Sequence, residues 1–199
     1  MRPREMVISA GELEISSEQN AAYRLTWLFY QGQIQMRIGI ISDTHNDLYA
    51  IDQFLTVLES EKIQTIIHCG DMTRSATAEA FEDFEIHHVW GNGDLDTFGL
   101  QFAIQGCLPG STSTLTYSTV LENQRLIALH GHDRKLLRSL IECGSYEYLF
   151  YGHTHHQELQ RYGKTIIINP GALGGGFRST HSYVILDLKS GETTFKTTA

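Results

Sequence analysis

The sequence has too few cysteines for a disulfide framework. Cys69, Cys107 and Cys143 are an odd number among 199 residues, and no CxxC pair is present. This usage fits a reducing compartment and argues against a disulfide-stabilised secreted domain. We expect all three cysteines to be small core residues.

Positive charge is scarce as well. Fifteen Lys and Arg residues face 23 Asp and Glu residues, so the formal net charge is -8 and the sequence pI is about 5.6. Such a chain lacks the electrostatic footprint of a protein that binds a nucleic-acid duplex. A phosphate-containing substrate must then be attracted locally, and bound cations are one way to do this.

Long hydrophobic runs are also missing. The longest apolar stretches, WLFY, TIII and YVIL, are far shorter than the roughly 20 residues that a membrane-spanning helix needs. The N-terminus lacks the apolar segment of a signal peptide. We therefore expect a cytoplasmic protein with no membrane partner.

The composition suits one globular domain. The chain has 41% apolar and 19% charged residues, and its length allows a full core. Residues 1–35 are polar and weakly patterned, and Met36 then opens a clean strand pattern. We divide the chain into an N-terminal extension of uncertain status over 1–35 and a domain over 36–199. The extension is either an added hairpin or docking arm, or the result of a misplaced start codon.

The pattern from residue 37 predicts an α/β fold. Strands over 37–42, 63–70 and 85–91 alternate with helices over 47–61 and 75–84, which indicates parallel strands joined by right-handed crossovers. The second half predicts mainly antiparallel strands: hairpin-like pairs over 114–120 with 125–130, 158–163 with 164–171 and 182–189 with 192–198, plus a helix over 134–144 and a strand over 147–152. The economical architecture is a two-sheet α/β sandwich of mixed strands with flanking helices.

Five of the predicted strands end in polar turns. These turns are Asp43-Thr44-His45, Gly70-Asp71, Gly91-Asn92-Gly93-Asp94, His130-Gly131-His132 and Gly152-His153-Thr154-His155. Open α/β sheets place their ligand sites at the carboxyl ends of strands. We therefore expect these turns to meet in one site.

The residue types in these turns predict a metal site. Imidazole and carboxylate suit Zn, Mn, Fe, Ni or Co, and the lack of ligand cysteines disfavours a structural zinc. His153 and His155 are two residues apart, so they share a face of an extended segment or reach two neighbouring metals from a turn. Two divalent ions about 3.5–4 Å apart can clamp a phosphoryl group and activate a shared water. Such a pair needs a bridging carboxylate, for which Asp71 is the natural candidate.

The ordered set DTH, GD, GNGD, HGH, GHTH and NPG resembles the calcineurin-like metallophosphoesterase superfamily over residues 36 to about 188. The GNxD and NPG forms resemble its small YfcE-type phosphodiesterase branch. The resemblance implies an α/β sandwich around a binuclear metal site, with Mn²⁺ as the expected ion and Fe, Ni, Co or Zn as alternatives. It implies that one ion is held by Asp43, His45, Asp71 and His155, and the other by Asp71, Asn92, His130 and His153. Asp71, Asn92 and His130 are the residues that we assign to catalysis.

Gly93 departs from the wider superfamily pattern. Many members carry a histidine at this position, and it is thought to assist the phosphate or to protonate the leaving oxygen. General-acid assistance is typically worth about 10² to 10⁴ in rate. Without it, we expect the rate to fall steeply as the leaving group becomes more basic, unless His132 or a metal-bound water supplies the proton. Asp94, which would orient such a histidine, is then left to hold its turn or to support the ligands.

Several other polar residues have weaker assignments. We expect His68 to pack beside the site, and His87, His88, His156 and His181 to be solvated or edge residues. The Asn169-Pro170-Gly171 turn is assigned to rigid turn geometry near the metals. Arg178, in a glycine-rich segment, is either a contact for a substrate phosphate or a solvated residue.

Together these features predict a metal-dependent phosphoesterase, specifically a phosphodiesterase that hydrolyses small phosphodiesters through a metal-bridging hydroxide. Two alternatives stay open. One is a nuclease, and the other is a catalytically weak scaffold like the retromer subunit that is built on this fold. The oligomeric state is not indicated by the sequence.

Overall fold

The computed structural model describes residues 36–175, 179 and 181–198. The predicted extension over 1–35 and Arg178 lie outside these residues. The elements in chain order are β1 (Arg37–Ile41), α2 (Leu48–Ser60), β2 (Thr65–His68), the 3-10 helix η1 (Ser75–Phe81), β3 (Glu85–Val89), α3 (Thr97–Ile104), β4 (Thr112–Thr114), β5 (Tyr117–Leu121), β6 (Gln124–Ala128), α4 (Arg134–Glu142), β7 (Tyr148–Phe150), β8 (Gln157–Tyr162), β9 (Thr165–Pro170), β10 (Ser182–Asp187) and β11 (Thr193–Thr197). Among the described helices, none is long and apolar enough to cross a membrane.

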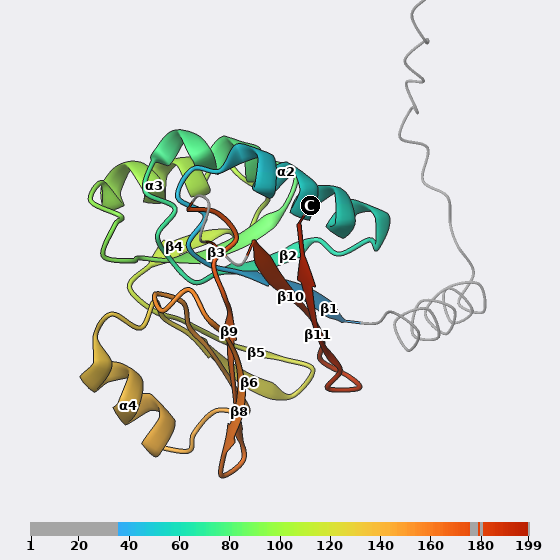
Figure 1. Ribbon diagram of the computed structural model, residues 1–199, viewed down its shortest axis with the longest axis vertical. Helices are drawn as coiled ribbons and strands as arrows, with labels where there is room; N and C mark the ends of the chain where they lie inside the picture. Colours follow the sequence, from blue (N-terminus) through green and yellow to red (C-terminus); the bar gives the residue numbers. More distant parts are fainter. Residues whose placement is uncertain (1–35, 176–178, 180, 199) are drawn as a thin grey trace, which may run out of the picture. The chain divides into compact units, whose positions relative to one another are not determined.

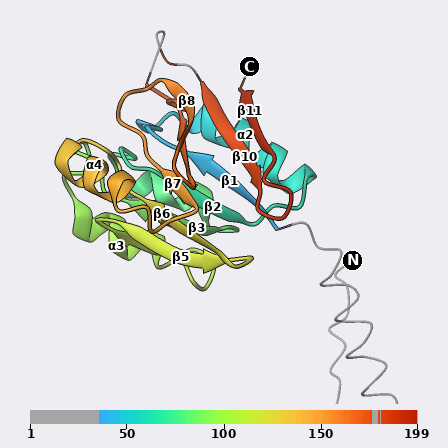
Figure 2. The same cartoon turned by 90° about the horizontal axis from the view of Figure 1, so that it is seen from below.

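The domain consists of two sheets packed face to face, each covered by helices on its outer side (Figures 1 and 2). The first sheet has the strand order β11-β10-β1-β2-β3-β4, and the second has the order β5-β6-β7-β9-β8. Helices α2, η1 and α3 cover the first sheet, whereas α4 covers the second. This arrangement confirms the predicted two-sheet sandwich of mixed strands with flanking helices.

Helix α2 forms because its apolar residues repeat at helical spacing. Ile51, Phe54, Leu55 and Leu58 are buried on the face that meets the first sheet. The helix begins at Asp47, whose side chain accepts a hydrogen bond from the Ala50 backbone N–H at 3.1 Å. Burial of each such side chain stabilises the fold by about 1.5–3 kcal/mol.

The strand directions place the polar turns at one edge of the sandwich. β1, β2, β3 and β4 run parallel. The three predicted hairpins of the second half are present as β5-β6, β8-β9 and β10-β11. The centre of the second sheet, however, is parallel through β6, β7 and β9, and β10-β11 joins the first sheet beside β1. These two features were not predicted, and the parallel centre aligns the carboxyl ends of β6 and β7.

Two elements were missed and one differs in type. Helix α3 carries buried Leu100 and Ile104 on one side and exposed Phe98 and Phe102 on the other, so no apolar stripe marks it. β4 has three residues, too few for a clear alternation. The predicted helix that begins at Ser75 is a 3-10 helix.

Four assignments of burial were wrong. His87 and His88 are buried, not solvated, because β3 is an interior strand of the first sheet. Cys69 is buried as expected, but Cys107 is half-buried and Cys143 is exposed. Cys143 lies at the C-cap of α4, where the helix faces solvent.

Candidate metal centre

The predicted ligands lie in tight turns that follow the strands. Asp43, His45, Asp71, His153 and His155 all have positive φ angles, of 52°, 44°, 57°, 66° and 60°. This left-handed conformation costs a residue with a side chain about 1–2 kcal/mol. Such conformations gather at functional sites, where the surrounding structure enforces them.

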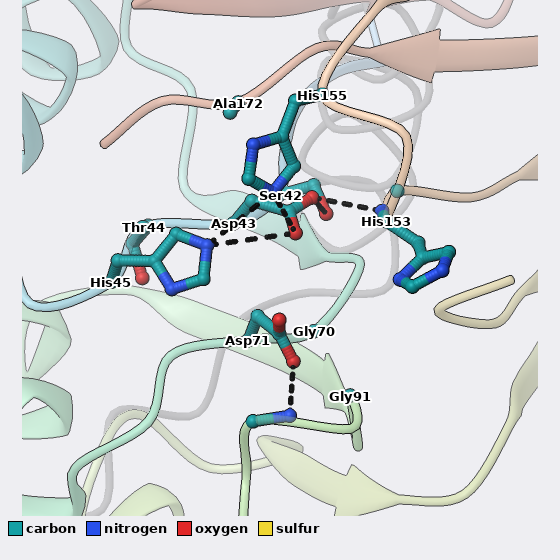
Figure 3. A network of polar contacts seen from close by, with 12 residues as sticks. Ser42, Asp43, Thr44, His45, Gly70, Asp71, Gly91, His153, His155 and Ala172 are labelled. Atoms are coloured by element: carbon teal, nitrogen blue, oxygen red, sulfur yellow. Dashed lines mark hydrogen bonds and ion pairs between the residues drawn. The ribbon is translucent and has the colours of Figure 1, made fainter. Parts of the chain in front are cut away.

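The first cluster joins Asp43, His45 and His155 (Figure 3). Asp43 Oδ1 lies 3.1 Å from His155 Nε2 and 3.9 Å from His45 Nε2. The two imidazole nitrogens are 3.4 Å apart. One carboxylate oxygen and two imidazoles therefore face a common point, with ligand atoms within 4.8 Å of one another.

The second cluster joins Asp43, Asp71 and His130 within the same 4.8 Å limit. His130 Nδ1 lies 2.7 Å from the Cys69 carbonyl oxygen, which can only accept a hydrogen bond. In the neutral imidazole the proton therefore sits on Nδ1, which leaves the lone pair on Nε2. That Nε2 lies 3.4 Å from Asp71 Oδ1, which is the ligand-ready tautomer typical of metal-binding histidines.

Asp43 is shared by both clusters, and its two oxygens have different environments. Oδ2 accepts hydrogen bonds from Ser42 Oγ at 2.5 Å and from the His153 backbone N–H at 3.0 Å. Oδ1 is buried and, within the described part of the chain, has no hydrogen-bond partner. Ser42 was not among the predicted site residues, although a hydroxyl directly after an apolar strand is a visible signal.

The donor set fits a divalent cation. His130 Nε2, like Asp43 Oδ1, is a buried atom that no described residue hydrogen-bonds. Unpartnered buried polar atoms cost about 1–3 kcal/mol each, and more when charged. Two carboxylates in one cluster also repel each other. A cation that binds these nitrogen and oxygen atoms removes both costs.

Two glycines make this close approach possible. A Cβ atom at Gly91 would lie 2.5 Å from the Asp71 backbone nitrogen, and it would overlap the Asp71 carboxylate. A Cβ atom at Gly152 would lie 2.7 Å from Asp43 Oδ2 and overlap Ser42 Oγ. Glycine is therefore required at both positions by space rather than by backbone angle.

Asp94 holds the turns beneath the cluster. Its carboxylate accepts backbone N–H bonds from Asp71 at 2.9 Å, Thr73 at 2.7 Å and Gly91 at 2.7 Å. His88 Nε2 lies 3.3 Å from the same carboxylate. Burial raises the pKa of Asp94, but His88 and the backbone donors outweigh it and hold that pKa well below the usual range. Asp94 thus has the turn-holding role that was one of its two predicted alternatives.

Two other predicted supports are confirmed. His68 is buried beside the site, where its Nδ1 accepts a hydrogen bond from the Gly70 backbone N–H and its Nε2 lies 3.0 Å from Thr44 Oγ1. Asn169 donates from Nδ2 to the Gly152 carbonyl at 2.8 Å and to Thr154 Oγ1 at 3.1 Å. The carboxyl end of β9 therefore stabilises the turn after β7.

Two histidines of the predicted turns, His132 and His153, are not members of the two clusters. Asn92 is exposed. His153 contributes its backbone N–H to Asp43, and its ring centroid lies 5.1 Å from that of His130. Burial, followed by the nearby His130, lowers the pKa of His153. The His132 ring centroid lies 5.5 Å from that of His130.

Gly93 closes the site from the side of β3. Its backbone N–H donates to Asp71 Oδ1 at 2.7 Å. A Cβ atom there would lie 3.1 Å from that oxygen, so any side chain would push against the carboxylate. Position 93 therefore orients Asp71 through its backbone and supplies no proton donor from a side chain.

Comparison with known proteins identifies relatives of the whole described domain. Residues 36–191 match the profile of the calcineurin-like phosphoesterase superfamily domain. A protein named phosphodiesterase MJ0936, from Methanocaldococcus jannaschii, is 28% identical over 159 residues, which are 79% of this chain and 96% of that protein. A probable metallophosphoesterase of the same organism, MJ0623, is 26% identical and covers 86% of this chain and 85% of its own length.

Solved structures show the same fold. An archaeal phosphodiesterase superposes with a TM-score of 0.76 at 28% identity, and covers 81% of this chain and 99% of its own. The Escherichia coli phosphoesterase YfcE superposes with a TM-score of 0.59 at 21% identity, and covers 81% and 98%. Vacuolar protein sorting 29 from Cryptosporidium parvum, at 18% identity and a TM-score of 0.57, covers 80% and 95%.

Proposed function

Because this chain belongs to the calcineurin-like phosphoesterase superfamily, we propose that it is a metal-dependent phosphodiesterase whose reaction takes place at the two clusters around Asp43. One observation carries the proposal: the buried Asp43 carboxylate belongs to both clusters, and its Oδ1 accepts no hydrogen bond from any residue that the structure describes. Relatives that are named phosphodiesterases support the same activity.

The proposed ligands come from both sheets. Asp43, His45, Asp71 and His155 would hold one ion, and Asp71, Asn92, His130 and His153 the other, with Mn²⁺ as the proposed metal. Bound divalent ions supply Lewis-acid polarisation of a phosphoryl oxygen and a nucleophile at neutral pH. The bridging role of Asp71 is part of this proposal.

The protein's own residues orient this site. Ser42 and the His153 backbone N–H hold one oxygen of Asp43, so that the other faces the cluster. The Gly93 N–H holds Asp71, and the Cys69 carbonyl fixes the His130 tautomer. Groups that are positioned in advance need no reorganisation during the reaction, which is a main source of catalytic rate.

The charge of the chain favours small substrates. With a net charge of -8, the protein repels a long polyanion. A small diester carries a single negative charge, which two divalent ions can attract locally. We therefore propose small phosphodiesters rather than duplex nucleic acid.

The test is hydrolysis of bis-p-nitrophenyl phosphate by metal-stripped protein, with and without added Mn²⁺. We expect activity that needs the metal and that falls at least about 100-fold in Asp43→Asn and His155→Ala. His156→Ala is the matched control, because this neighbouring imidazole is exposed and contacts the Thr154 carbonyl of its own turn. Its activity should stay within about twofold of the wild type.

The contrary result would be a folded protein that binds Mn²⁺ but does not hydrolyse any small diester. Turnover of single-stranded DNA or RNA in place of small diesters would instead identify a nuclease. If neither class is hydrolysed, the fold acts as a scaffold, the other class of function that the sequence allows.

A further inference from the structure

A cavity of about 440 Å³ opens beside the metal centre, between α4 and the second sheet. His153 and Thr154, from the turn after β7, form its side toward the centre. The remaining wall is formed by Gly131, Arg134, Leu137, Arg138, Ile141, Glu142, Tyr151 and Tyr162. His153 therefore belongs to both the cavity wall and the metal centre, since its backbone N–H donates to Asp43.

The chemistry of the wall suits an aromatic group. Leu137 and Ile141 lie half-buried on the inner face of α4, and Tyr151 and Tyr162 add two aromatic rings. Small-molecule sites combine apolar and aromatic walls with a few polar groups and have volumes of roughly 300–1,000 Å³. The cavity therefore accommodates a group of aryl or nucleoside size.

One cation in the wall is available to a ligand. Arg138 forms an ion pair with Glu142 at 2.7 Å. Arg134, in contrast, has no ion pair with any residue that the structure describes. Although the chain has a net charge of -8, the Arg134 guanidinium can locally attract a hydrogen-bond acceptor or a negatively charged group.

We propose that this cavity is the subsite for the organic group that stays on the phosphate, and that this group is aromatic with an acceptor directed at Arg134. The inference rests on the proposed function and names its substrate class. The retained group fits better than the leaving group, for a physical reason. Position 93 provides no acid, so the leaving oxygen must take its proton from water or from another donor, and the apolar and aromatic part of this wall offers few groups that could position such a water.

Binding tests the subsite independently of turnover. Titration calorimetry on the Mn²⁺-loaded protein would compare thymidine 5′-phosphate with methyl phosphate, which share the phosphate and differ in the organic group. We expect the thymidine ester to bind at least about tenfold more tightly. Ile141→Trp, which fills the cavity, should remove that difference, and Ser139→Trp, on the exposed side of the same helix, should keep it.

A second pair of variants tests the cation. Arg134→Ala should weaken binding of thymidine 5′-phosphate by about three- to tenfold. Lys135→Ala is the matched control, because it removes the same charge from the same turn without touching the cavity wall. Equal affinity for the two phosphates in the wild type, or a difference that persists in Ile141→Trp, would overturn the subsite.

Kinetics then separates this inference from the proposed function. Thymidine 5′-(p-nitrophenyl phosphate) and methyl p-nitrophenyl phosphate release the same phenolate, so the ratio of their kcat/KM values reports the retained group alone. We expect that ratio to fall about tenfold in Ile141→Trp and to stay within about twofold of the wild type in Ser139→Trp. A protein that binds with the expected difference but hydrolyses neither ester would refute the proposed function and retain the subsite.

Discussion

At the scale of single residues, the candidate site depends on which oxygen or nitrogen of each side chain is already occupied. Asp43 uses Oδ2 for two protein donors and presents Oδ1, and His130 uses Nδ1 and presents Nε2. The fixed atom determines the direction of the free one, so the ligand atoms are oriented before any ion binds. Three predictions belong to this scale.

The first concerns Asp94. Asp94→Ala leaves three backbone N–H groups without their acceptor, so we expect the free energy of unfolding to fall by about 3 kcal/mol. Denaturant unfolding measures this loss. Asp96→Ala is the comparison, because this exposed carboxylate caps the single Gly99 N–H and its loss should cost about 1 kcal/mol. Equal effects would show that Asp94 does not hold the turns.

The second concerns the dependence of stability on pH. Burial lowers the pKa of His87 from 6.5 to about 4. Between these two pH values the unfolded chain binds a proton that the folded chain does not, so the free energy of unfolding should fall as pH drops from about 6.5 toward 4. His87→Gln should reduce this loss by roughly 1–3 kcal/mol in denaturant unfolding at pH 7 and at pH 5. The same slope in both proteins would contradict a neutral buried His87.

The third concerns the leaving group. Because Gly93 has no side chain to donate a proton, log kcat/KM across a series of aryl phosphodiesters should fall steeply as the pKa of the leaving phenol rises. The series must be measured under conditions in which the chemical step limits the rate. A flat dependence would mean that another group protonates the leaving oxygen, and the His132→Gln variant would then be the next to examine.

At the scale of elements, α4 is the helix on which the proposed subsite depends. It buries no residue completely, and the apolar residues on its inner face are half-buried against the second sheet. Its first turn is held by Asp133, which accepts hydrogen bonds from the Lys135 and Leu136 backbone N–H groups at 3.0 Å. The cap should therefore contribute a large share of the local stability of the helix.

Removal of this cap should loosen α4 selectively. In Asp133→Ala we expect the amides of α4 to exchange hydrogen about fivefold faster, which corresponds to a loss of about 1 kcal/mol. The amides of α2, which has its own cap at Asp47, should not change. Hydrogen-exchange mass spectrometry distinguishes the two helices. Equal acceleration in both would indicate global destabilisation instead of a local opening.

At the scale of the whole domain, the two clusters link the two sheets. Asp43, His45 and Asp71 follow strands of the first sheet, whereas His130 and His155 follow strands of the second. Ions that bind both sets therefore bind the folded state and have no equivalent site in the unfolded chain.

Metal binding should accordingly stabilise the domain. At an Mn²⁺ concentration 100 times the dissociation constant, the gain is about 2.7 kcal/mol per site. We expect the unfolding midpoint of metal-stripped protein to rise on addition of Mn²⁺ in differential scanning calorimetry. Asp43→Asn should abolish most of the rise because Asp43 belongs to both clusters, and His156→Ala should leave it unchanged. An equal rise in Asp43→Asn would place the ions elsewhere.

The sequence by itself determined the architecture and the candidate ligands. Apolar periodicity fixed β1, α2, β2, β3 and the three hairpins, because burial of alternating or helically spaced residues is a local property of the chain. The polar turns at the strand ends were visible because each directly follows one of the apolar strand patterns. The resemblance of their ordered motifs then named the family, which the match over residues 36–191 confirms.

The tertiary structure alone decided what depends on partners that are distant in the chain. It placed β6, β7 and β9 side by side in parallel and buried His87 and His88 in an interior strand. It also made Asp43 the residue that both clusters share. It also packed α4 against the second sheet to form the cavity beside His153. These features arise from long-range pairing and burial, which no local pattern of residues encodes.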